Sequence, residues 1–123
     1  MTIRHIVTQA RQVVSQAQPI LAREQLSLEE WLVLDVLAER NGLAMSEIAT
    51  ATLASNATLT RHVESLVSRA LVYRETGPTD RRQFVIYLSK RGKSLHERIA
   101  SRLAQLVVSR ESLAGRGESG VVT

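Results

Sequence analysis

The sequence predicts a mainly α-helical fold with one β-hairpin, and three local patterns in its 123 residues support this prediction. Residues 3 to 21 carry apolar side chains at alternating steps of three and four, which is the period of a helix. Residues 27 to 30 read S-L-E-E, with Ser and Glu at the two positions of a helix-capping box. Two short segments, 71–74 and 83–88, flank the turn residues Gly77 and Pro78, as is typical of a hairpin.

The first expected helix has one narrow apolar seam. Pro19 should end or kink this helix near Gln18, because proline lacks a backbone donor and clashes with the preceding turn. A narrow seam is more typical of a helix that faces a partner helix than of one that covers its own core. Packing within the same domain is the alternative, but so small a domain has little core to spare for a long helix. The seam residues expected at an intermolecular interface are Ile3, Ile6, Val7, Ala10 and Val13.

Two further helices are expected in the next stretch. A second helix should open at Ser27, where the capping box with Glu30 satisfies its first amides, and should end at Asn41-Gly42. Trp31 is interpreted as a core residue of this helix rather than as a ligand platform. A short third helix should cover residues 45–52.

A fourth helix should open at Ser55, a favourable N-cap, and its two faces differ in character. The residues expected to face the core are Leu59, Val63, Leu66, Val67 and Ala70, and those expected on the opposite face are Ala57, Arg61, Glu64, Ser65 and Ser68. Small and hydrogen-bonding side chains at a helix start allow approach to base edges, while the orphan amides there can meet phosphate. Arg61 is therefore the candidate for a bidentate contact to guanine. Asn56 could read adenine or cap the helix.

The hairpin that follows the fourth helix carries Asp80, Arg81 and Arg82. A guanidinium on a narrow loop fits a minor groove, where the negative potential is strongest. Asp80 would then brace one of the arginines. An ordinary solvated turn is the alternative, and these three residues alone would favour it. Together, helices two to four and the hairpin form a helix-turn-helix followed by a wing.

A long last helix should begin after Ser89, with a seam of Leu95, Ile99, Leu103, Leu106 and Val107. The final residues 114–123 contain three glycines and little to bury, so we expect a disordered tail there. The chain thus divides into an N-terminal helix (1–24), a helix-turn-helix with wing (25–89), a C-terminal helix (90–113) and the tail.

Composition excludes several function classes. Sixteen basic and twelve acidic residues give a net charge of +4, so an anionic partner must be met by a local cluster. The chain has no cysteine, which excludes disulfides, thiolate metal sites and thiol redox sensing. His5, His62 and His96 share no ligand spacing, and no nucleophile is paired with a base, so we expect no metal, no cofactor and no enzymatic activity. Neither a signal peptide nor a membrane-spanning run is visible, which predicts a cytoplasmic protein.

Several short motifs occur together along the chain. They are Leu28, Trp31 and Leu34; Ser46-Glu47-Ile48-Ala49; Ser55-Asn56-Ala57-Thr58-Leu59-Thr60-Arg61 with Leu66; Leu71-Val72-Tyr73-Arg74; Asp80-Arg81-Arg82; and Leu88-Ser89-Lys90-Arg91-Gly92. With these motifs, from about residue 26 to residue 95 and loosely over its whole length, the chain resembles the MarR-type winged-helix transcriptional regulators. The D-x-R element at a fixed distance after T-R is fairly specific, whereas each piece alone is weak.

The resemblance implies an obligate homodimer that binds pseudo-palindromic operators in double-stranded DNA. The first and last helices would form the dimer, which adds Leu103, Leu106 and Val107 to the interface. Arg82 would enter the minor groove while Asp80 braces the wing, and a small lipophilic or aromatic effector could release the DNA. The residues expected to contact DNA are Ser46, Ser55, Asn56, Ala57, Thr58, Thr60, Arg61, Arg74, Arg81 and Arg82.

The chain departs from the family pattern at Ala70, where relatives usually have Gly between recognition helix and strand. If that position needs a positive φ, Ala costs about 1 kcal/mol there. The alternative function is a winged-helix protein-interaction module without DNA binding. Ala57, Glu64 and Ser68 favour that alternative slightly, whereas the arginines of the recognition helix and the hairpin oppose it more strongly.

Overall fold

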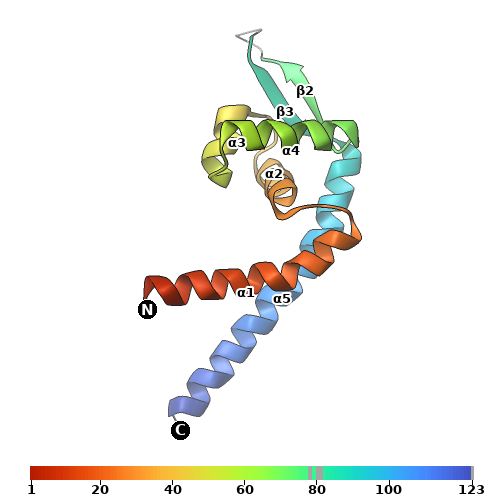
Figure 1. The fold of residues 1–123 in the computed structure, drawn as a ribbon. Helices are drawn as coiled ribbons and strands as arrows, with labels where there is room; N and C mark the ends of the chain where they lie inside the picture. Colours follow the sequence, from red (N-terminus) through yellow and green to blue (C-terminus); the bar gives the residue numbers. More distant parts are fainter. Residues whose placement is uncertain (78, 80–81, 123) are drawn as a thin grey trace. The chain divides into compact units, whose positions relative to one another are not determined.

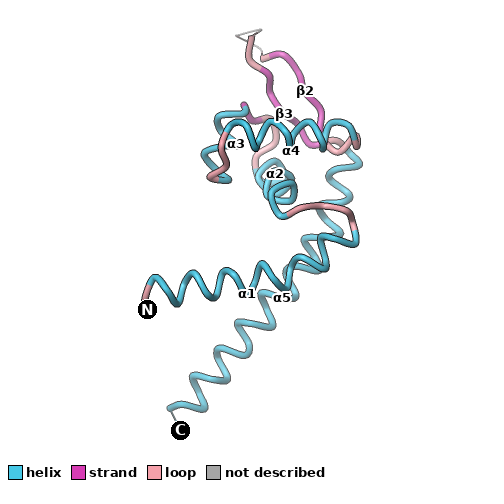
Figure 2. Tube along the Cα trace, viewed as in Figure 1, coloured by secondary structure: helices cyan, strands magenta, loops and turns pink. Residues whose placement is uncertain are grey.

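The chain forms two compact units in the computed structural model, which describes residues 1–77, 79 and 82–122, with only the backbone for 107–122. One unit is Leu26–Glu97, and the other combines Met1–Gln25 with Arg98–Thr123. The elements follow in the order α1 (Ile3–Arg23), α2 (Leu28–Glu39), β1 (Leu43–Ala44), α3 (Met45–Thr52), α4 (Asn56–Ser68), β2 (Val72–Thr76), β3 (Phe84–Leu88) and α5 (Lys90–Val122) (Figures 1 and 2).

The unit Leu26–Glu97 packs α2, α3 and α4 against a small antiparallel sheet with the strand order β1-β3-β2. The expected hairpin is β2–β3, in which Tyr73 lies opposite Tyr87. The third strand, β1, was not predicted: it pairs Leu43 with Ile86, and two residues are too short to give a strand pattern. The sheet therefore attaches the hairpin to the segment that leads into α3.

An aliphatic core joins these elements. Its most buried side chains have less than 2% of their surface exposed, and those of this unit are Val33, Leu34, Leu37, Ile48, Leu59, Val63, Leu66, Leu71, Val72 and Ile86. Four expected core positions of α4 can be checked here: Leu59, Val63 and Leu66 are buried, whereas Val67 is half-buried.

The helix starts agree with the sequence patterns. Ser27 caps α2: its Oγ accepts from the Glu30 amide at 3.1 Å, and Glu30 Oε1 accepts from the Ser27 amide at 3.0 Å. Leu26 and Trp31 flank this box and are both buried, as a hydrophobic staple requires. The helix ends at Glu39, and Gly42 follows with a φ of +83°.

Ala70 does not face the core, so that prediction is wrong. The amide of Ala70 donates to the Val67 carbonyl and the amide of Leu71 to the Leu66 carbonyl, both at 3.0 Å, which is a Schellman ending of α4. Ala70 lies at the left-handed position of this motif, with a φ of +59°. Because of this turn, the Ala70 side chain does not point to the core side of α4, and it is exposed.

Helix α1 does not end near Gln18. It continues through Pro19 to Arg23, where Glu24 is the C-cap. Ala17 and Leu21, on either side of the proline, are buried, and this packing outweighs the one backbone hydrogen bond that proline removes. In the same unit, Arg98 of α5 pairs with Glu24, with 3.3 Å between Nε and Oε1.

The backbone of α5 is helical to Val122, which differs from the disordered tail expected over 114–123. The segment contains no proline, and a helix adds one hydrogen bond for each further residue. Leu103 and Leu106 are half-buried, whereas the side chain of Val107 lies outside the described residues. Across the part of the chain that the structure covers, no helix has the length and apolarity that a membrane span requires.

Candidate nucleic-acid interface

The start of α4 is built by Ser55. Its Oγ accepts from the Thr58 amide at 3.3 Å and donates to Thr58 Oγ1 at 2.9 Å. Ser55 is therefore the N-cap, and Asn56 is the first helical residue, with a side chain that does not serve as the cap. The structure therefore excludes helix capping as the role of Asn56, and its contact with adenine stays a prediction. One turn later, Thr60 Oγ1 donates to the Asn56 carbonyl at 2.8 Å.

The residues expected to contact DNA lie on the surface wherever the structure describes them. The exposed ones are Ser46, Ser55, Asn56, Ala57, Thr60, Arg61, Arg74 and Arg82, while Thr58 is half-buried. Arg81 and Asp80, the latter expected to brace the wing, lie outside the described residues, as does Pro78 of the expected turn. The outward face of α4 is thus open to a partner along its first two turns.

An open cavity of about 380 Å³ brings three of these residues together. Its lining combines Ala44, Met45 and Ser46 at the start of α3, Asn56 at the start of α4, and Arg82, Gln83 and Phe84 of the hairpin. We call it the hairpin cavity. Two helix N-termini, a hydroxyl, two side-chain amides and a guanidinium supply the donors and positive potential that bind anionic oxygens.

One contact to the segment after α2 and two contacts within the hairpin fix the hairpin strands. Asn41 Oδ1 accepts from the Leu88 amide at 2.8 Å, at the end of β3 nearest α5. The rings of Tyr73 and Tyr87 stack with their centroids 5.4 Å apart. Towards the tip, the Gly77 amide donates to the Gln83 carbonyl at 2.7 Å. These contacts fix β2, which carries Arg74, and the start of β3, which Arg82 precedes by two residues.

Phe84 is a site residue that sequence reasoning missed. Its side chain is 50% exposed and lines the hairpin cavity next to Arg82 and Gln83. The available signal was its position as the second residue of the expected strand 83–88, where an aromatic side chain beside a basic loop can contact a sugar or a base.

Behind the outward face, α4 is tied to α2 by Ser65 and Glu30. Ser65 was expected to face outward, but it is half-buried and its hydroxyl donates to Glu30 Oε2 at 2.8 Å. Burial raises the pKa of Glu30, but hydrogen bonds from the Ser27 amide and from the Ser65 and Ser27 hydroxyls, with the charge of Arg69, outweigh burial. The net result is a Glu30 pKa below its ordinary value of 4.5.

A second polar contact joins α2 to the first turns of α5. The ring of His96 stacks on Trp31 with centroids 4.7 Å apart, and its Nε2 lies 2.8 Å from Asp35 Oδ1. Trp31 is buried, as the sequence predicted. Among the described residues, no three His, Cys, Asp or Glu side chains are grouped as a metal site.

Comparisons with known proteins give consistent matches. The model of the MarR family matches residues 24–83. The HTH-type transcriptional regulator FarR of Neisseria gonorrhoeae is 27% identical over 109 residues, covering 88% of this chain and 75% of the relative.

Two solved structures show the same fold. NadR in complex with 4-hydroxyphenylacetate is similar with a TM-score of 0.83 and 24% identity, over 99% of this chain and 87% of that chain. The MepR–DNA complex of Staphylococcus aureus is similar with a TM-score of 0.70 and 23% identity, over 94% and 93%.

Proposed function

We propose that the chain is a MarR-type transcriptional regulator, a repressor that binds a pseudo-palindromic operator as a homodimer. The observation that carries this proposal is the hairpin cavity, where Ser46, Asn56 and Arg82 meet. These residues come from three elements that a winged helix-turn-helix places against DNA. The similar fold of MepR bound to DNA supports the same placement.

Each part of the interface would have its own role on DNA. Arg61, exposed on α4, would make a bidentate contact to guanine in the major groove. Ser46 and Ser55, at the starts of α3 and α4, would position the protein on phosphates. Arg82 would enter the minor groove, where a narrow groove concentrates negative potential. For Arg81 and Asp80 the roles remain those that the family resemblance implies.

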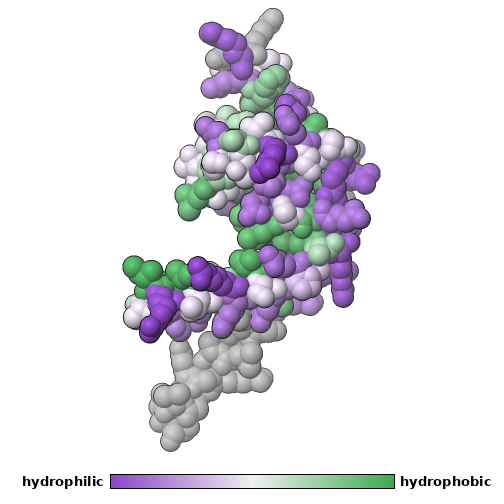
Figure 3. Space-filling model, in the orientation of Figure 1, coloured by the Kyte–Doolittle hydropathy of each residue, from purple (hydrophilic) through white to green (hydrophobic). Residues whose placement is uncertain are grey.

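The dimer would use the apolar seam of α1 together with α5. Ile3, Ile6 and Val7 are 80%, 52% and 38% exposed, and apolar side chains gather at this end of α1 in Figure 3. Within the single chain, only Ala17 and Leu21 of the α1 seam are buried. The N-terminal half of the seam can therefore be covered by a second copy. Two copies would present two recognition helices to half-sites about one DNA turn apart.

Release would follow from a small lipophilic or aromatic effector. NadR, whose fold is similar, was solved in complex with 4-hydroxyphenylacetate. A small rotation between two recognition helices breaks their match to the half-site spacing, so an effector needs to shift them only slightly. A repressor that acts on chromosomal DNA is expected in the cytoplasm. Binding to the operator requires no enzymatic activity.

The test is fluorescence-anisotropy binding to DNA from upstream of the chain's own coding sequence, with unrelated DNA of equal length as control. We expect selective binding whose log affinity falls linearly with log salt concentration, with a slope of about −0.9 for each phosphate contacted. Weak binding that is equal for both DNAs would contradict the proposal and favour a protein-interaction module.

A further inference from the structure

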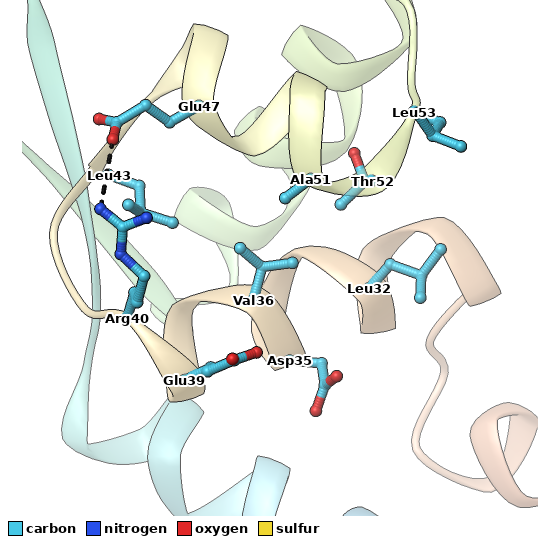
Figure 4. Close-up of a pocket in the computed structure, with 10 residues that line it drawn as sticks. All are labelled: Leu32, Asp35, Val36, Glu39, Arg40, Leu43, Glu47, Ala51, Thr52 and Leu53. Carbon is cyan, nitrogen blue, oxygen red and sulfur yellow. Dashed lines mark ion pairs between the residues drawn. The ribbon is translucent and has the colours of Figure 1, made fainter.

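A groove of about 500 Å³ lies between α2 and α3 (Figure 4). Its lining shares no residue with the hairpin cavity. This volume falls within the range of sites that hold small organic ligands. We call it the α2–α3 groove.

Half of the residues that line the α2–α3 groove are apolar. Leu32 and Val36 line it from α2, Leu43 from β1, and Ala51 from α3. Figure 4 shows Val36 and Ala51 directed toward one another across the gap between the two helices. Leu53, at the end of α3, forms part of the lip and is 91% exposed. An apolar ligand body placed here would remove this surface from water.

The polar lining of the same groove is negatively charged. Three carboxylates, those of Asp35, Glu39 and Glu47, accompany a single guanidinium, that of Arg40. Asp35 also lies 2.8 Å from Nε2 of His96, outside the lining. Arg40 lies 3.6 Å from Glu47, and its side chain is 73% exposed, so it can leave this position at little cost. The excess of carboxylates repels an anionic ligand and attracts a cation.

We propose that the α2–α3 groove binds a lipophilic cation, meaning an organic molecule with an apolar body and one positive charge, and that its binding weakens DNA binding. The inference rests on the proposed function, for which it supplies the effector class and the effector site. The proposed ligand is a cation, whereas the 4-hydroxyphenylacetate bound to NadR carries a carboxylate.

Glu47 connects the groove to the DNA-binding surface. One of its oxygens pairs with Arg40, and the other accepts from the Ala44 amide at 3.0 Å, which closes the first turn of α3. Ser46, in that same turn, lines the hairpin cavity together with Asn56. A cation that draws Glu47 toward the groove and separates α3 from α2 therefore moves a residue of the DNA interface.

The first experiment compares two probes of the same shape and opposite charge by isothermal titration calorimetry on the full chain. Tetraphenylphosphonium is a lipophilic cation, and tetraphenylborate is its anionic counterpart. We expect the cation to bind at least about tenfold more tightly than the anion. Equal binding, tighter binding of the anion, or no binding of the cation would overturn the inference.

Variants then locate the site. Ala51→Trp fills the groove from an exposed position of α3 and should weaken tetraphenylphosphonium binding about tenfold or more. Glu39→Gln leaves the groove open but removes one negative charge, and it should weaken tetraphenylphosphonium binding about threefold. Glu29→Gln is the matched control, because Glu29 is exposed on the same helix and does not line the groove. Binding that is unchanged in both Ala51→Trp and Glu39→Gln would overturn the inference.

The regulatory half is tested by repeating the anisotropy measurement with the cation present. Saturating tetraphenylphosphonium should weaken DNA binding about tenfold in the wild type and have little effect in Ala51→Trp. Unchanged DNA affinity in the wild type would overturn the inference. So would a shift of Ala51→Trp from dimer to monomer in sedimentation, because a second copy would then occupy the groove. Failure of the proposed function would appear separately, as non-selective DNA binding without any probe.

Discussion

The hydroxyl of Ser65 on α4 donates a 2.8 Å hydrogen bond to Oε2 of Glu30 on α2. The other carboxylate oxygen of Glu30 accepts from the Ser27 amide, so one side chain both closes the start of α2 and holds the recognition helix. Glu30 is only 9% exposed, and water replaces these bonds poorly at such a site. The position of α4 therefore depends on a carboxylate whose ionised form these hydrogen bonds stabilise.

Acid should destabilise the fold through Glu30. Its pKa is lowered in the folded chain, so the unfolded chain binds the proton first as the pH falls. The stabilisation is complete above the ordinary pKa of 4.5 and is lost as the pH falls through the folded pKa. Between about pH 6 and about pH 3, the free energy of unfolding in urea should fall further in the wild type than in Glu30→Gln.

The control for this titration is Glu29→Gln, which changes an exposed carboxylate one position away. It should keep the pH dependence of the wild type. If Glu30→Gln retained that dependence as well, Glu30 would not be the group whose protonation matters.

Ala70→Gly should stabilise the protein. Ala70 has a φ of +59°. In this left-handed conformation a Cβ atom is strained against the backbone, whereas glycine has no Cβ and adopts it without strain. The expected gain is about 1 kcal/mol in the free energy of unfolding, measured by urea denaturation. Ala38→Gly is the matched control, because Ala38 is exposed within α2 and the same change there should cost about 1 kcal/mol. Loss of stability in Ala70→Gly would contradict the assignment of strain.

Elements whose ends are fixed by local chemistry could be predicted from the sequence. Ser27 and Ser55 are the N-caps that the patterns indicated, and α3 covers Met45–Thr52 as expected. Capping depends on residues three positions apart, so a short window contains the whole signal. The individual candidates at the site, such as Asn56 and Arg82, could be named for the same reason.

Features that depend on distant contacts could not be predicted. Ser65 falls on the polar side of α4 in the periodic pattern, and its partner Glu30 lies 35 residues earlier. The hairpin cavity exists because β1 pairs with β3 and so brings Arg82 beside the start of α3, and two-residue β1 leaves no pattern. Likewise, the burial of Leu21 carries α1 past Pro19, a tertiary effect that overrides the local preference.

Gly92→Ala should disrupt the junction between β2 and α5. A Cβ atom at Gly92 would lie 2.0 Å from the Leu71 carbonyl oxygen, which is backbone and cannot swing away. The Ser89 amide already donates to that same carbonyl at 3.1 Å. We expect a loss of about 2–3 kcal/mol in the free energy of unfolding. Ser94→Ala, at an exposed position two residues further along α5, should stay within about 0.5 kcal/mol of the wild type. If Gly92→Ala had the unfolding free energy of the wild type, the junction would accommodate the Cβ atom without cost.

Arg61→Ala and Arg82→Ala should affect DNA binding in different ways. Loss of a bidentate contact to guanine costs about 1–3 kcal/mol and relaxes the preference at one base pair. Loss of a minor-groove guanidinium weakens binding to all sequences and reduces the salt slope by about 0.9. Anisotropy with a set of single-base operator variants at several salt concentrations separates the two effects.

Arg102→Ala is the control for both arginines, because Arg102 is exposed on α5 and carries the same charge. It should leave affinity, base preference and salt slope unchanged. Wild-type binding by both Arg61→Ala and Arg82→Ala would exclude α4 and the hairpin as the DNA-binding surface.

Ile6→Glu should separate the proposed dimer without unfolding the chain. Ile6 is 52% exposed in the single chain, so a carboxylate there meets water until a second copy covers it. Burying that charge in an apolar seam carries a large desolvation cost, and dimer affinity should fall about a hundredfold. Sedimentation velocity over a range of concentrations measures this shift. Gln9→Glu adds the same charge at an exposed position of α1 outside the seam and should leave the dimer intact. If Ile6→Glu sedimented as the wild type does, the exposed half of α1 would not be the dimer interface.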